Sequence, residues 1–152
     1  MYKWILLAHV MGGAMLFGGH VYIESLTAAA GRAKDDVAYM TVMMRAGEAA
    51  NRVLGVASVL TIVFGVWLVL ESAAFEFEDL FISIGLLAIV VAFAVSIFLM
   101  GPRFKAITAL VEENGFGDGA AVAKMKSFVS LIHVQTLVVA LAFVVMVLKP
   151  GF

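Results

Sequence analysis

The sequence predicts an all-α fold, an integral membrane bundle of four helices in up-down-up-down order that forms one transmembrane domain over residues 1–152. Hydrophobic residues make up 64% of the chain and charged residues only 14%, and the mean hydropathy is +1.09. An average soluble domain has about 25% charged residues. A chain this apolar could not cover its own surface in water, so we expect lipid to be its solvent.

Four apolar runs indicate the helices, which we expect at about 2–30, 47–71, 79–113 and 120–149. Each run approaches the length of about 20 residues that a helix needs to cross the hydrocarbon core. Gly101-Pro102 is expected to stop the third span, with residues 103–113 prolonging it as a helical extension, and Lys149-Pro150 to stop the fourth, because proline cannot continue the hydrogen-bond ladder. The glycine-rich segment 115–119 is expected to be a turn.

Charge predicts the orientation. Eight of the ten basic residues lie in the connections between helices one and two and between helices three and four, namely Arg32, Lys34, Arg45, Arg52, Arg103, Lys105, Lys124 and Lys126. The charged residues in the connection between helices two and three are all acidic. By the positive-inside rule, both basic connections face the cytoplasm, and both termini lie outside the bacterial inner membrane.

Composition also excludes several classes of function. The net charge of −1 gives no reason to expect a nucleic-acid partner, and the absence of cysteine excludes disulfides and thiolate metal sites. No glycine-rich phosphate loop, nucleophile–base pair or suitable carboxylate pair is present. What remains is a small set of polar residues within apolar helices, a position where ionisable groups are costly and usually functional.

The first helix carries most of these polar residues. At about 100° per residue, His20 and Glu24 fall within about 20° and about 60° of His9, so the three share one face. Gly13 lies on the same stripe, and small residues let a neighbouring backbone or a flat cofactor come close. Glu24 lies near the hydrocarbon boundary, so we expect it to pair with Arg52 or Arg45.

Depth indicates which histidines meet. At about 1.5 Å per residue, His20 lies about 25 Å from the outer end of helix one, and His133 lies about 24 Å from the outer end of helix four. His9 lies about 15 Å closer to that surface. Two imidazoles facing each other across a bundle are typical of six-coordinate haem b, so His20 and His133 are the expected ligands, with Arg52 near the propionates. The simpler alternative is that these histidines only hydrogen-bond to neighbouring groups.

Other readings stay open. His9 with Met11 and Met15 is a candidate copper-handling set, because thioethers are soft ligands. The small size also fits a non-enzymatic accessory subunit of a larger membrane complex. For the haem-binding reading, the expected chemistry is electron transfer or haem- or quinone-linked redox, with the bilayer, a quinone, a membrane-protein partner or a second copy of the chain as partners.

The chain also resembles the small four-helix membrane proteins that include CopD-like and HemJ-like proteins, and in particular an uncharacterised bacterial branch of predicted integral membrane proteins. The matching residues are Trp4–His9, Phe17-Gly18-Gly19, Tyr22, Arg45, Gly55, Gly65 and Met146–Pro150. The resemblance implies that His9 is the helix-one histidine associated with haem b in the HemJ-like enzymes. Glu24 and Ser25 stand where those enzymes carry an arginine, which argues against protoporphyrinogen oxidation. If His9 is a ligand, the opposite group must come from the same level, and Met146 is the candidate.

Overall fold

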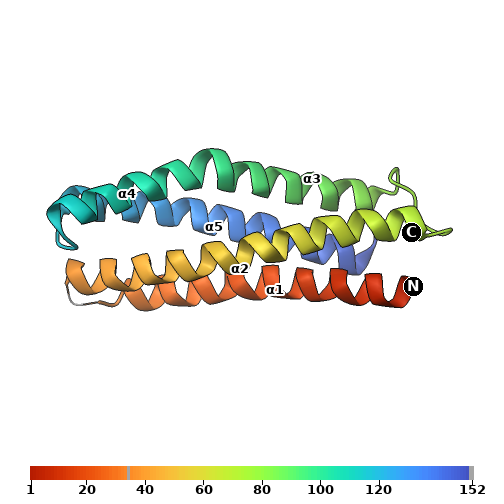
Figure 1. The fold of residues 1–152 in the computed structure, drawn as a ribbon, viewed down its shortest axis with the longest axis horizontal. Coiled ribbons are helices and arrows are strands. Elements are labelled where there is room, and N and C mark those ends of the chain that lie inside the picture. Colours follow the sequence, from red (N-terminus) through yellow and green to blue (C-terminus); the bar gives the residue numbers. More distant parts are fainter. Residues whose placement is uncertain (34, 151–152) are drawn as a thin grey trace.

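The structure, a computed structural model, describes residues 1–33 and 35–150, and within them every regular element is helical. The elements are α1 (Tyr2–Ala30), α2 (Asp36–Glu71), α3 (Leu80–Val95), the π-helical segment η1 (Ser96–Met100), α4 (Gly101–Asn114) and α5 (Gly119–Leu148). Because α3, η1 and α4 run on as one helix, the chain forms four long helices side by side (Figure 1). The predicted all-α four-helix bundle is confirmed. Lys34, one of the basic residues counted above, lies outside the described residues.

All four helices are long and apolar enough to cross a membrane. Large hydrophobic side chains are exposed along their outer surfaces, among them Val10, Leu87 and Leu137. The chain is therefore a multi-pass membrane protein whose outer surface contacts lipid. Both termini and the connection 72–79 lie at one end of the bundle, here called the terminal end (Figure 1). The opposite end, with the other two connections, is called the loop end.

The Gly101-Pro102 pair does not stop the third span, so that expectation was wrong. The five residues before it, Ser96–Met100, form a wide π-helical turn in which the Gly101 N–H donates to the carbonyl of Ser96. Such a turn leaves room for the proline ring, and Pro102 then sits in the first turn of α4, where a missing N–H matters least. Residues 103–113 prolong the helix, as expected.

Local sequence explains the other helix ends. The helix expected from residue 47 begins at Asp36, because the Asp35 carboxylate accepts a hydrogen bond from the Ala38 N–H at 2.7 Å and caps it. Asp118 caps α5 in the same way, through the N–H of Ala121 at 2.7 Å. Gly115 adopts a φ of +86°, which glycine tolerates without strain, and closes the turn before α5. The fourth helix ends at Leu148, before Pro150, as predicted.

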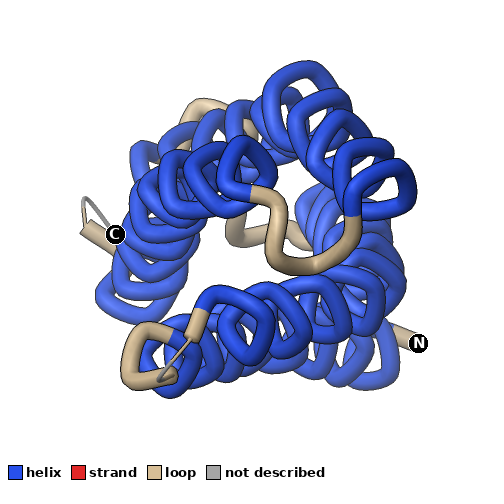
Figure 2. The backbone as a smooth tube through the Cα atoms, turned by 90° about the vertical axis from the view of Figure 1, so that its left-hand side faces the viewer, coloured by secondary structure: helices blue, strands red, loops and turns tan. Residues whose placement is uncertain are grey.

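Helix pairing divides the bundle into two halves. α1 packs mainly against α2, and α3 and α4 pack against α5, while α1 also contacts α5. Figure 2 shows the helices, seen end-on, arranged around a common axis. The largest core cluster lies at the loop end, where Met40, Ile107 and Met125 are fully buried. Towards the terminal end the buried core is smaller, so the helices there are less fully packed.

Gly12 is the glycine at which α1 and α2 approach most closely. A Cβ on Gly12 would lie 3.0 Å from the backbone nitrogen of Thr61, whereas a Cβ on Gly13 would meet nothing within 4 Å. Gly13 was expected to face the bundle interior or a cofactor, and it does line a cavity described below. Its predicted role in close helix packing belongs to Gly12 instead.

We expect Gly12→Val to destabilise the bundle by roughly 1–3 kcal/mol, because the added methyl groups would force the two backbones apart. Gly18→Val is the matched control, since Gly18 is exposed on the same helix and has open space around it. Denaturant-induced unfolding in detergent micelles measures both. Equal midpoints for the two variants would show that Gly12 has no packing role.

Candidate functional site

Two cavities lie within the bundle, one towards each end. The terminal cavity has a volume of about 440 Å³ and is lined by residues of α1, α2, α3, α5 and the connection 72–79. The loop-end cavity has a volume of about 510 Å³ and is lined by residues of all four long helices. His9 lines the terminal cavity, and His20 lines the loop-end cavity. The two histidines of α1 therefore line different cavities.

His9 is held in a defined tautomer at the wall of the terminal cavity. Its Nδ1 lies 2.9 Å from the carbonyl oxygen of Thr61, and since a carbonyl only accepts, Nδ1 carries the proton and donates. Nε2 is then the unprotonated nitrogen with a free lone pair. The imidazole lies against α2 at Gly65, where a Cβ would come within 2.9 Å of the His9 Cε1. A histidine whose second nitrogen donates to a backbone carbonyl is arranged as metal-ligating histidines are.

Met146 lines the same cavity from α5. Its methyl group lies so close to Gly85 of α3 that a Cβ at Gly85 would overlap it. The antiparallel register supports this placement, because Glu24 contacts His133 and His20 contacts Thr136. Carried to the terminal end, the same register brings His9 to the level of Met146. His9 and Met146 thus line one cavity at one level, and each side chain lies against a glycine of a neighbouring helix.

The rest of the terminal cavity is apolar and aromatic. Its rim includes Phe75, Phe81 and Phe143. Lys149, the only charged residue that lines the cavity in the described part of the chain, places its Nζ 4.7 Å from the centre of the Phe75 ring. The cavity therefore combines an apolar interior with one cation at its mouth, at the terminal end of the bundle.

The loop-end cavity has polar groups at two levels. His20, only 4% exposed, has its Nδ1 3.3 Å from the Thr136 hydroxyl, which can donate or accept, so its tautomer is not fixed. The Gln135 amide donates to the carbonyl of Ala92 at 3.2 Å and to the Ser96 hydroxyl at 2.5 Å, next to the π-helical turn. π-Helical turns are frequent at functional sites. Ser58 of α2 also lines this cavity and has no hydrogen bond to any described residue.

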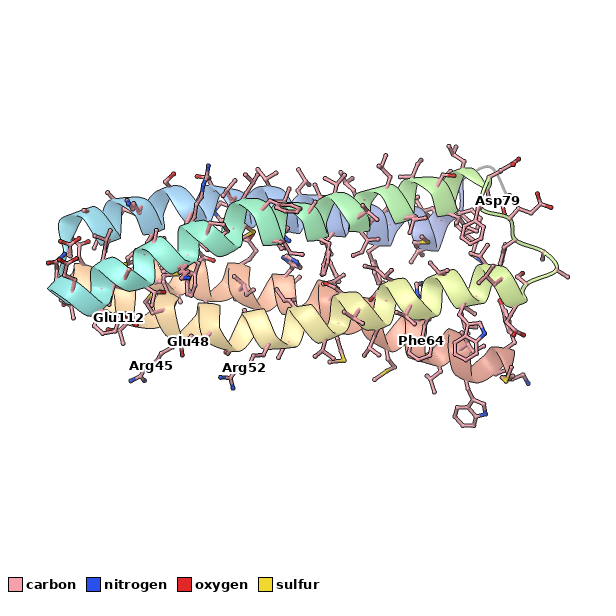
Figure 3. All side chains as sticks on the ribbon, turned by 45° about the horizontal axis from the view of Figure 1, so that its top comes forward. Arg45, Glu48, Arg52, Phe64, Asp79 and Glu112 are labelled. Atoms are coloured by element: carbon pink, nitrogen blue, oxygen red, sulfur yellow. The ribbon has the colours of Figure 1, made fainter. Side chains whose placement is uncertain are left out.

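His133 lies outside both cavities. Its side chain is 55% exposed, and its Nδ1 is 2.6 Å from Oε2 of Glu24. The other oxygen of Glu24 is buried and has no hydrogen-bond partner among the described residues. Glu24 needs a partner near hydrocarbon, as expected, but its partner is His133 and neither predicted arginine lies within ion-pair distance. The reason is helical phase, because Arg45 and Arg52 extend from α2 away from the bundle (Figure 3).

The structure thus separates residues that the sequence grouped. His20 and His133 lie at similar levels but do not line one cavity, and Arg52 is exposed on the outer side of α2. Met11 and Met15 are 54% and 40% exposed and line neither cavity, so they do not join His9. Within residues 1–33 and 35–150, no three His, Asp or Glu side chains converge as a metal cluster.

Two features of the site were missed in the sequence. Gly65 and Gly85 make room for His9 and Met146, and Thr61 orients His9. Spacing along one helix does not reveal these partners, because each lies on a different helix. The constant antiparallel register could have found them, since it pairs the start of α1 with the ends of α2 and α5.

No family model matches the sequence, and no curated protein or solved structure is significantly similar to it. The assignment of a function therefore rests on the residues and geometry described above.

Proposed function

We propose that this chain is a membrane electron-transfer protein that binds haem b in the terminal cavity, where His9 and Met146 would hold the haem iron. The observation that carries the proposal is that both side chains line one cavity, with His9 Nδ1–H donated to the Thr61 carbonyl. That hydrogen bond leaves the lone pair of Nε2 free to bind a metal ion and makes Nε2 a stronger electron-pair donor.

The chemistry of the cavity fits this group. Aromatic and aliphatic walls suit a porphyrin face, and Gly13 lines the cavity with open space in front of it. Lys149 at the mouth is the cation available to a propionate. When bound, haem supplies one-electron chemistry, and a methionine ligand raises its reduction potential relative to two histidines.

The roles of the chain's own residues follow from their contacts. Thr61 fixes the tautomer and the ring orientation of His9. Gly65 and Gly85 allow the imidazole and the thioether to lie against α2 and α3. The apolar walls exclude water, which lowers the local dielectric and leaves the ligand bonds undisturbed by competing hydrogen bonds.

Copper handling is the second candidate, because a neutral imidazole and a thioether are also ligands for Cu(I). The same His9–Met146 pair favours it, although Met11 and Met15, which would strengthen such a site, are exposed elsewhere on α1. The larger aromatic cavity around the pair favours haem, since a single copper ion would leave most of its about 440 Å³ empty.

A titration of purified protein with haemin separates these two functions. We expect the absorption of a six-coordinate low-spin haem to rise and saturate at one haemin per chain. Under reducing conditions, a competing chelator should bind Cu(I) more tightly than the protein does. A haemin response that never saturates, beside tight stoichiometric binding of Cu(I), would replace haem with copper as the ligand.

The orientation of the protein is part of the proposal. Because eight of ten basic residues lie in the two loop-end segments, we expect the loop end in the cytoplasm and the terminal cavity on the outer side. Glu113→Cys, at the loop end, should resist an impermeant thiol reagent in intact cells, and Glu76→Cys, at the terminal end, should react; both side chains are exposed. The opposite labelling would reverse the side on which the haem exchanges electrons.

A further inference from the structure

The loop-end cavity is a second space that haem in the terminal cavity would not use. We propose that this cavity binds the head group of a lipid-soluble quinone, with His20 and Ser58 as hydrogen-bonding residues for its two ring oxygens. The inference goes beyond the proposed function and does not depend on haem, because it concerns different residues and a different cavity.

The cavity lies beside a loosely packed side of the bundle. Its lining includes Gly55 of α2 and Phe93 and Ile97 of α3 and η1; all three are exposed, and α2 makes few contacts with α3. The cavity therefore opens sideways between α2 and the α3–η1 helix, near the middle of the helices, where the surroundings are hydrocarbon. A ligand that enters by this route must be soluble in the lipid tails.

The cavity contains polar groups without hydrogen-bond partners among the described residues. His20 Nε2 and the Ser58 hydroxyl make no hydrogen bonds to described residues, although both residues line the cavity. In the antiparallel register set by Gly12 and Thr61, Ser58 lies about five residues, or about 7.5 Å, farther from the loop end than His20. The other polar side chains that line the cavity are Ser96 and Gln135, which hydrogen-bond to each other, and Lys105. The two separated groups His20 Nε2 and Ser58 Oγ match a flat ring that carries an oxygen at each end.

A quinone and its quinol differ in the direction of their hydrogen bonds. A quinone oxygen only accepts, whereas the corresponding quinol hydroxyl also donates. The Thr136 hydroxyl can donate to or accept from His20 Nδ1, so His20 Nε2 can be either donor or acceptor. The Ser58 hydroxyl has the same double capacity. His20 and Ser58 can therefore hydrogen-bond to both the quinone and the quinol. A ligand whose polar groups do not change would not require this double capacity.

Binding of duroquinone to purified protein without haem, in nanodiscs, tests the proposal. Durene, which has the same ring and methyl groups but no oxygens, is the matched control ligand. We expect saturable binding of duroquinone and at least roughly tenfold weaker binding of durene, since two hydrogen bonds are lost. Equal binding of the two ligands would reduce the cavity to an apolar void and overturn the proposal.

Substitutions of residues that line the cavity test whether the quinone binds there. Gly55→Phe should abolish duroquinone binding, because Gly55 lines the cavity and a phenyl ring there competes with the ligand for space; a Cβ at Gly55 meets nothing within 4 Å, so the fold is retained. Gly18→Phe, on the exposed side of α1, is the steric control and should bind normally. His20→Ala and Ser58→Ala should each weaken binding by roughly two- to tenfold, with His20→Gln restoring part of the loss. Undiminished binding by Gly55→Phe would place the quinone elsewhere and contradict the inference.

Discussion

Gly13→Phe should abolish haem binding while leaving the bundle folded. Gly13 lines the terminal cavity, and a Cβ there meets nothing within 4 Å, so a side chain can be added and a phenyl ring competes with haem for the cavity. Gly18→Phe also has open space in front of its Cβ but lies on the exposed side of α1, and it should bind haem normally. The measurement is the haemin titration, with helix content followed by circular dichroism. Full stoichiometric binding by Gly13→Phe would remove the terminal cavity as the haem site.

Met146→Leu should remove the six-coordinate low-spin spectrum, and Met146→His should restore it at a lower reduction potential. Leucine keeps the approximate volume and removes only the sulfur, whereas histidine supplies an imidazole, and replacing a methionine ligand by histidine lowers the potential. Redox titration followed by absorption measures both effects.

Met11→Leu is the matched control for these variants, because Met11 is 54% exposed and lies outside the cavity. Its spectrum and potential should equal those of the unmodified protein. A Met146→Leu protein that keeps both would show that the opposite ligand is another residue.

The fold was predictable because lipid imposes one strong rule. A backbone in hydrocarbon must satisfy its own polar groups, so each apolar run had to be a helix, and hydropathy alone located all four. The helix ends were less predictable. Pro102 was expected to stop a helix, but the π-helical turn Ser96–Met100 accommodates it, and a Gln135 side chain from α5 donates a hydrogen bond to Ser96 in that turn. Such long-range support leaves no signal in the local sequence.

The site was only partly predictable. Axial depth follows from residue counting, so the similar levels of His20 and His133 could be anticipated. Rotation about each helix axis is set by packing against neighbours, and it turns His133 out of the loop-end cavity towards Glu24. The same packing turns Arg52 away from the bundle and brings Met146 into the cavity of His9. Residue counting along one helix gives the depth of a residue in the membrane. The side of the helix on which its side chain meets a neighbour depends on how the helices pack in the bundle.

Glu24 and His133 form a hydrogen-bonded ionisable pair within two of the membrane helices. One oxygen of Glu24 is buried without a partner, and the pair lies one turn from His20 and Thr136 on the same two helices. Ionisable groups so placed in membrane helices commonly carry protons. They lie far from the terminal cavity, so substitutions here should leave haem binding intact.

The absorption spectrum of the haem-titrated His9→Ala protein, recorded beside those of His20→Ala and His133→Ala, tests the central claim most directly. His9 is the histidine of the terminal cavity, held by Thr61 with Nε2 free, whereas His20 and His133 have partners elsewhere. The account predicts that His9→Ala loses the low-spin haem spectrum and that the other two variants keep it. A His9→Ala protein that retains the spectrum, together with its loss in His20→Ala and His133→Ala, would contradict the account and place the haem between His20 and His133.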